Sequence, residues 1–110
     1  MEYGLTTSAI ARIQAVFARY PEVEKAVLYG SRAKGTHKTG SDIDLTLYGE
    51  KLALPQLTAI ASELDDLLLP YTIDLSIFAM LNNAELREHI GRVGKVFYER
   101  ERKTAASGNV

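Results

Sequence analysis

The sequence predicts an α+β domain of two layers, in which helices pack mainly on one face of a mixed sheet of three to four strands. Three observations support this fold class. The chain has 110 residues, a length typical of one domain. Three segments repeat apolar residues at helical spacing, and four short segments have the composition of strands. Along the chain these segments follow the order αββαβαβ.

The first half of the chain is expected to hold one helix, two strands and a helical turn. Thr7 or Ser8 can cap the helix, which ends before Pro21. Gly30 breaks the first strand, and the turn that follows is stopped by Gly35. The expected ranges are a helix to about residue 20, a strand at 24–29, a turn at 32–34 and a strand at 42–48.

The second half is expected to form two further helices and two strands. Pro55 suits the first turn of one helix, which stops before Pro70. Asn82 or Asn83 can cap the other helix, and Gly94 ends it. The stripe of the first of these helices is expected to be Leu57, Ile60, Ala61, Leu64 and Leu68, and that of the second Leu86, Ile90 and Val93. The strands are expected at 71–78 and 96–98, within a domain of residues 1–99 that is followed by a flexible polar tail at 100–110.

Composition excludes several classes of function. A net charge of −1 argues against nucleic-acid or membrane binding that is driven by bulk charge. The absence of cysteine excludes a disulfide framework and a thiolate zinc site, and it fits a reducing cytoplasm. No apolar run approaches the length of a membrane span, and the N-terminus has no basic region typical of a signal peptide. We therefore expect a cytoplasmic protein.

Two aspartates flank an apolar residue inside the second expected strand. Side chains alternate between the faces of a strand, so Asp42 and Asp44 point the same way while Ile43 faces the core. Their Cα atoms should lie about 7 Å apart, two strand rises. Asp74 has a similar position in the third strand. If these two strands are neighbours, three carboxylates converge on one face of the sheet.

Three adjacent carboxylates repel one another unless a cation lies between them. Oxygen ligands without cysteine favour Mg²⁺, or Mn²⁺, over zinc. Such carboxylates can hold two ions about 4 Å apart, an arrangement that clamps the attacking and leaving oxygens at phosphorus. The alternative is that these acids form an ordinary solvated face.

A glycine and a serine mark the turn after the first strand. Gly30 permits close approach to the backbone, and free N–H groups at such a turn attract phosphate. The Ser31 hydroxyl can donate to a phosphate oxygen, and Arg32 and Lys34 add positive charge. The alternative is a capped turn with solvated basic side chains.

The combination resembles a known family. The stretch reads GSRAKGTHKTGSDIDL, a Gly-Ser pair followed by ten residues and Asp-x-Asp. This pattern resembles the signature of the DNA polymerase beta-type nucleotidyltransferase superfamily, specifically its minimal nucleotidyltransferase branch (MNT). The ending HIGRVGKVFYER is similar to the closing helix and strand of that branch. The matching positions are Gly30, Ser31, Asp42, Asp44 and Asp74.

The resemblance implies an activity and a role for each matched residue. Asp42 and Asp44 would bind two Mg²⁺ ions, and Asp74 would complete one metal site and help to activate the attacking hydroxyl. Gly30 and Ser31 would hold the phosphates of ATP. A nucleoside monophosphate, AMP for ATP, would pass to the acceptor, and pyrophosphate would leave. For Arg32, phosphate contact and a surface role are both open.

The resemblance also implies a partner. The chain has no room for the helical domain of larger family members, and the minimal branch pairs instead with small helical proteins of the HEPN type. Some of these pairs resemble toxin–antitoxin systems, in which the nucleotidyltransferase adenylylates a tyrosine of the HEPN toxin. Two alternatives remain open: a binding module that neutralises its partner by occlusion, and a transferase for small molecules such as aminoglycosides.

The histidines and several tyrosines carry no motif. His37 is expected in a solvated loop, and His89 is expected to be structural or on the surface. Tyr29, Tyr48 and Tyr71 border strands and are expected to pack against the core.

Overall fold

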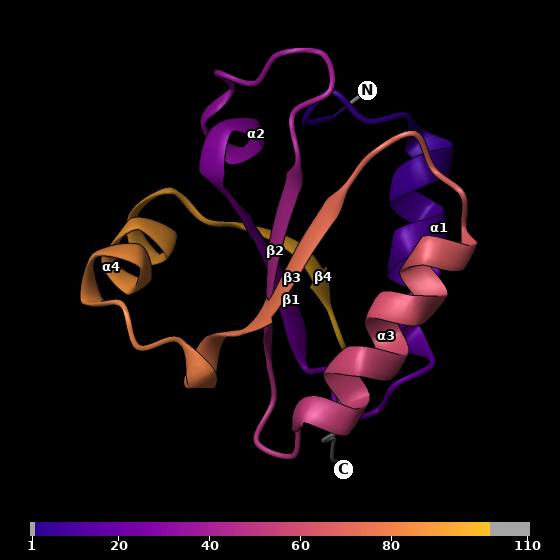
Figure 1. Ribbon diagram of the computed structural model, residues 1–110, viewed down its shortest axis with the longest axis vertical. Helices are drawn as coiled ribbons and strands as arrows, with labels where there is room; N and C mark the ends of the chain where they lie inside the picture. The colour runs from indigo at the N-terminus through magenta and orange to yellow at the C-terminus, as the bar shows by residue number, and fades with distance from the viewer. Residues whose placement is uncertain (1, 102–110) are drawn as a thin grey trace, which may run out of the picture.

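A computed structural model describes residues 2–101 of the chain. Its centre is one four-stranded sheet with the strand order β3-β2-β1-β4 (Figure 1). β1 runs antiparallel to both β2 and β4, whereas β2 and β3 are parallel, so the predicted mixed sheet is confirmed. The elements are α1 (Thr7–Ala18), β1 (Lys25–Tyr29), α2 (Gly30–Lys34), β2 (Ile43–Tyr48), α3 (Leu54–Asp66), β3 (Ile73–Ile77), the 3₁₀ turn η1 (Phe78–Met80), α4 (Ala84–Val93) and β4 (Lys95–Glu99).

Helices lie on both sides of the sheet. The two longest, α1 and α3, cover one face and touch each other, as the two-layer prediction requires (Figure 1). α4 lies on the opposite face against β1 and adds a layer that the sequence analysis does not anticipate. α2 and the loop that follows it stand at the end of the sheet where β1 ends and β2 begins.

The main core fills the space between the sheet and the α1–α3 pair. Ile43, as predicted, is fully buried on this side of β2, because alternate strand residues face the core. The buried residues of α1 on this side are Ala9, Ile13, Val16 and Phe17. The fully buried side chains of this cluster include Ile13, Phe17, Leu28, Ile43, Leu45, Leu47 and Ile60.

A smaller apolar cluster joins α4 to the other face of the sheet. It centres on Val27, Tyr29 and Ile90. Phe78 stacks on Tyr48 with a ring-centroid distance of 4.7 Å, and both rings pack against this cluster. This cluster packs α4 against the sheet face to which Tyr29 points.

Two boundary predictions are corrected. The N-cap of α1 is Thr6 and not the predicted Thr7 or Ser8, because the Thr6 hydroxyl accepts from the N–H of Ala9 at 3.0 Å. The helix therefore begins at Thr7. Leu68 does not extend the apolar stripe of α3. That helix ends at Asp66, and Leu68 adopts a left-handed conformation (φ 56°) that leaves its side chain 87% exposed.

The folded domain extends one residue beyond the predicted boundary. The N–H of Arg100 donates to the carbonyl of Glu24 at 2.9 Å. Its guanidinium donates to the carbonyl oxygens of Phe17, Ala18, Tyr20 and Val23. Arg100 thus fastens the end of β4 to the segment after α1. The rest of the predicted tail, from residue 102, lies outside the described residues.

Replacement of Arg100 by Ala is expected to lower the free energy of unfolding by about 2 kcal/mol, because charged donors to backbone carbonyls are lost together. Urea denaturation measures this. Arg92→Ala is the control, since Arg92 is exposed and forms its ion pair with exposed Glu88 in α4. Its effect should stay within about 0.5 kcal/mol. Equal losses in the two variants would contradict the anchoring role of Arg100.

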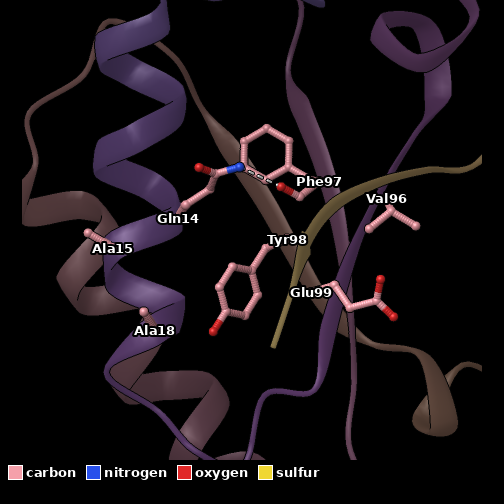
Figure 2. Close-up of a pocket in the computed structure, with 7 residues that line it drawn as sticks. All are labelled: Gln14, Ala15, Ala18, Val96, Phe97, Tyr98 and Glu99. Carbon is pink, nitrogen blue, oxygen red and sulfur yellow. Dashed lines mark hydrogen bonds between the residues drawn. The ribbon is translucent and has the colours of Figure 1, made fainter. Parts of the chain in front are cut away.

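A hollow of about 460 Å³ lies between α1 and the edge strand β4 (Figure 2). Tyr98 points from β4 toward α1, and Gln14 donates to the Phe97 carbonyl at 2.8 Å. The side chain of Gln14 thus satisfies a backbone acceptor on the edge strand. None of the predicted site residues lines this hollow.

Among residues 2–101, no helix combines the length and apolar character needed to cross a membrane.

Candidate active site

The predicted phosphate turn and the predicted metal strand are in direct contact. Gly30 follows the last residue of β1 and begins α2 with a left-handed φ of 76°. A Cβ atom at this position would lie 2.3 Å from Oδ2 of Asp44, closer than any real contact of that kind. Only glycine lets the backbone of the turn approach this carboxylate so closely. The two halves of the Gly-Ser/Asp-x-Asp pattern therefore lie against each other in the fold.

Two aspartates and a tyrosine form a row across the sheet. In the antiparallel pair, Tyr29 of β1 lies opposite Asp44 of β2. In the parallel pair, Asp44 lies beside Asp74 of β3. Residues in register on neighbouring strands point to the same face. The condition set by the sequence, that the second and third strands be neighbours, is therefore met, and Asp44 and Asp74 share the face opposite α1 and α3.

The electrostatics of Asp44 reflect this arrangement. Burial raises the pKa of its carboxyl group above the usual value, and the charges of Asp74 and Asp42 raise this pKa further. His89 and Arg32 act in the opposite direction. This carboxylate is partly desolvated and is repelled by two others. A bound cation would offset both the desolvation and the repulsion.

Asp42 stands at the margin of this group. It is exposed and lies just before β2, not within the strand as predicted. Within residues 2–101, no group of three or more His, Cys, Asp or Glu side chains is arranged as it stands to hold a metal ion. The donors nevertheless fit Mg²⁺ in kind, since all are carboxylate oxygens and Asp44 and Asp74 are in register. A site made of all three acids stays a prediction.

Arg32 is held by backbone carbonyls. Its side chain is only 3% exposed, and both Nε and Nη2 donate to the Ser41 carbonyl, at 3.1 and 2.7 Å. Nη1 donates to the Tyr3 carbonyl at 2.7 Å. These contacts favour a positioning role over either of the sequence-based interpretations, phosphate contact or a place on the surface. Ser31 is partly exposed at the start of the same helix.

Sequence reasoning missed two residues beside the acids. Burial raises the pKa of Tyr29, hydrogen bonding with Ser76 opposes the rise, and the charges of Asp74 and Asp44 add to it. The ring of His89, from α4, meets the Tyr29 ring edge-on with centroids 6.3 Å apart. Tyr29 does pack in the α4 cluster, as expected, but it also lies next to the candidate site. The only signal in the sequence was that Tyr29 directly precedes Gly30.

The polymerase beta nucleotidyltransferase family model matches residues 11–103. The chain belongs to this family. No protein of curated function matches the sequence. The family assignment and the four-stranded mixed sheet together confirm the predicted nucleotidyltransferase fold.

Several solved structures share the fold of this family member. One is a toxin–antitoxin complex with AMP-PNP, with a TM-score of 0.66 and 21% identity over 88% of this chain and 76% of that chain. Another is a tri-AMPylated HEPN toxin from Shewanella oneidensis in complex with its MNT antitoxin, with a TM-score of 0.64 and 17% identity over 87% and 74% of the two chains. A third is a putative nucleotidyltransferase from Sulfolobus solfataricus, with a TM-score of 0.50 and 18% identity over 88% and 92%.

Proposed function

We propose that this protein is a Mg²⁺-dependent nucleotidyltransferase that moves AMP from ATP to a hydroxyl group of a HEPN-type partner protein, and that it acts as the antitoxin of the pair. The contact between Gly30 and the Asp44 carboxylate carries the proposal. It joins a backbone turn suited to phosphate with carboxylates suited to a cation. Family membership supports the reaction class.

Each site residue has a proposed role. Asp42, Asp44 and Asp74 would hold two Mg²⁺ ions, or Mn²⁺, which neutralise charge at the triphosphate when they are bound. Gly30 and Ser31 would hold the phosphates of the leaving group, through the backbone and the hydroxyl group. The raised pKa of Asp44 supports the cation site, because a bound cation favours the ionised carboxylate.

In the proposed step, the acceptor hydroxyl oxygen forms a bond to the α-phosphorus of ATP. The bond between that phosphorus and the bridging oxygen breaks, and pyrophosphate leaves. Asp74 receives the proton of the hydroxyl group, directly or through a water molecule. Asp74 is exposed at the edge strand β3, where an acceptor on another protein can reach it.

The choice of partner rests on the solved structures. One of them holds a HEPN toxin that carries AMP groups beside an MNT antitoxin, and another holds a toxin–antitoxin pair with AMP-PNP. Both share the fold of this chain.

Incubation with α-labelled ATP, Mg²⁺ and a HEPN partner is expected to label the partner. Asp74→Asn should reduce the rate by about 10²–10⁴-fold, the usual contribution of a positioned acid or base. Asp65→Asn is the matched control, because Asp65 is exposed on α3, which covers the opposite face. Asp65→Asn should transfer AMP at the wild-type rate.

Two results would count against this function. If the wild-type protein labels no partner, or if Asp74→Asn labels it at the wild-type rate, the proposed chemistry is wrong. If the Asp74→Asn variant still silences the toxin in cells, the protein neutralises its partner by occlusion.

A further inference from the structure

The first residues of the described chain form a tight turn that folds back on itself. Glu2 and Leu5 exchange backbone hydrogen bonds of 3.2 and 2.8 Å. Between them, Tyr3 and Gly4 both adopt left-handed conformations, with φ of 58° and 74°. Leu5 is fully buried in the main core. We call residues 2–5 the N-terminal turn; its buried end fixes its place on the domain.

A buried arginine links this turn to the loop between α2 and β2. One end of the Arg32 guanidinium donates to the Tyr3 carbonyl at 2.7 Å, and the other end donates twice to the Ser41 carbonyl. The Arg32 side chain also lies over the Tyr71 ring, 5.1 Å from its centroid. A charged group that is almost fully buried is costly to leave unpaired, so these contacts are expected to be persistent.

The turn and the loop also fit closely at a second point. A Cβ atom on Gly4 would lie 2.4 Å from Nε2 of His37 and 2.8 Å from Nη1 of Arg32. The His37 ring therefore lies directly on the Gly4 backbone. Its Nδ1 atom is buried without a hydrogen-bond partner, which indicates that packing rather than hydrogen bonding holds the ring there. Only glycine allows this closure.

These contacts bear on the position of Asp42. The residue before it, Ser41, has its carbonyl oxygen held by Arg32. The residue after it, Ile43, donates its N–H to the Thr72 carbonyl at 2.9 Å. The backbone of Asp42 is therefore held between two anchored neighbours, although its side chain is exposed.

We infer that the N-terminal turn is a positioning device for the active site: through Gly4, Arg32 and His37 it holds the loop of residues 35–42, and so fixes Asp42 where it can share a cation with Asp44. The inference rests on the proposed function of the aspartates. The turn precedes the region that the family model matches, which begins at residue 11.

The first test is hydrogen exchange in the full-length, metal-free protein. Gly4→Ala should force the turn off the loop, and the amides of Thr36 and Ser41, which donate to Ser31 and Lys38, should exchange at least about tenfold faster. Arg32→Lys keeps the charge but not the fork of donors, and it should reproduce this change. Gly91→Ala is the control, since nothing lies within 4 Å of the added methyl group. It should leave loop exchange unchanged.

The second test is the Mg²⁺ dependence of AMP transfer. In Gly4→Ala and Arg32→Lys, the Mg²⁺ concentration for half-maximal rate should rise about 10–100-fold, as is usual when the support of a metal ligand is lost. The rate at saturating Mg²⁺ should recover most of the wild-type value. A variant that merely folded poorly would lose rate at every Mg²⁺ concentration.

The outcomes separate this inference from the proposed function. Unchanged loop exchange in both variants would overturn the inference, whatever the enzyme does. Faster loop exchange with an unchanged Mg²⁺ requirement would overturn the positioning of Asp42. If the wild-type protein transfers no AMP at all, the proposed function fails, and so does the role of the turn in catalysis, whereas hydrogen exchange still decides whether the turn holds the loop.

Discussion

Replacement of Asp44 by Asn is expected to abolish AMP transfer and, at the same time, to stabilise the metal-free protein near neutral pH. The loss of transfer should exceed about a hundredfold, because even residues that only support a metal ligand contribute up to that much. The gain in stability follows from the environment of this carboxyl group. Burial, Asp74 and Asp42 all disfavour its ionised form, and asparagine has nearly the same shape without the charge.

The sign of the pH dependence follows from linkage. The pKa of Asp44 in the folded protein lies above its unfolded value of 3.8, so the folded state binds the proton more tightly. The Asp44 contribution to stability is therefore fully present below pH 3.8 and is lost as the pH rises through the folded pKa. Wild type and Asp44→Asn should have similar free energies of unfolding below this window, and the variant should be the more stable above it.

Urea denaturation across this pH range measures the difference, and Mg²⁺ provides a second comparison. Added Mg²⁺ should raise the unfolding temperature of the wild type, since a ligand that binds only the folded state stabilises it. The same addition should have little effect on Asp44→Asn. Asp65→Asn, on the opposite face, should respond to Mg²⁺ as the wild type does. An Asp44→Asn variant that is less stable than wild type at neutral pH would contradict the claim that burial and the neighbouring charges make the ionised Asp44 carboxylate destabilising.

The position of the aspartates on the sheet could be predicted because it depends on local geometry. Alternation along a strand places Ile43 in the core, and hence Asp44 on the other face, whatever the rest of the chain does. The convergence of Asp44 with Asp74 needed one further fact, that β2 and β3 are neighbours. The parallel register supplies it and places the two carboxylates side by side.

The features that could not be predicted depend on segments far apart in the sequence. Arg32 follows the Gly-Ser pair, where a basic residue is equally compatible with a bound phosphate or with solvent. In the fold Arg32 turns inward and donates to the carbonyl of Tyr3, which lies 29 residues earlier in the chain. His89 reaches Tyr29 only because the chain passes from β3 through η1 to α4, which packs on the second face of the sheet. No periodicity in the sequence specifies that crossing.

Replacement of Gly30 by Ala is expected to reduce AMP transfer by more than about a hundredfold while the fold persists. Two effects act together at this residue. An alanine at a φ of 76° is strained by about 1–2 kcal/mol. Its Cβ atom would also meet Asp44 Oδ2 at 2.3 Å, so the carboxylate must move away from its place beside Asp74. Steady-state kinetics should show a lower kcat together with a higher KM for ATP, because both the proposed metal ligand and the proposed phosphate turn are displaced.

Gly35→Ala separates the two effects. Gly35 ends the same short helix with nearly the same φ, 79°, and nothing lies within 4 Å of a Cβ atom there. It should therefore lose similar stability from strain and much less activity than Gly30→Ala. Equal losses of activity in the two variants would mean that strain in α2, and not contact with Asp44, explains the need for glycine.

A double-mutant cycle with Asp44 gives the most direct measure of the contact. If the alanine methyl group displaces the carboxylate, then Gly30→Ala should cost less stability in an Asp44→Ala background, where no carboxylate remains to be displaced. The difference between the two costs should exceed about 0.5 kcal/mol, the limit within which separate sites are additive. Full additivity would show that Gly30 and Asp44 act independently. The close approach of Gly30 to the Asp44 carboxylate would then contribute nothing measurable to stability.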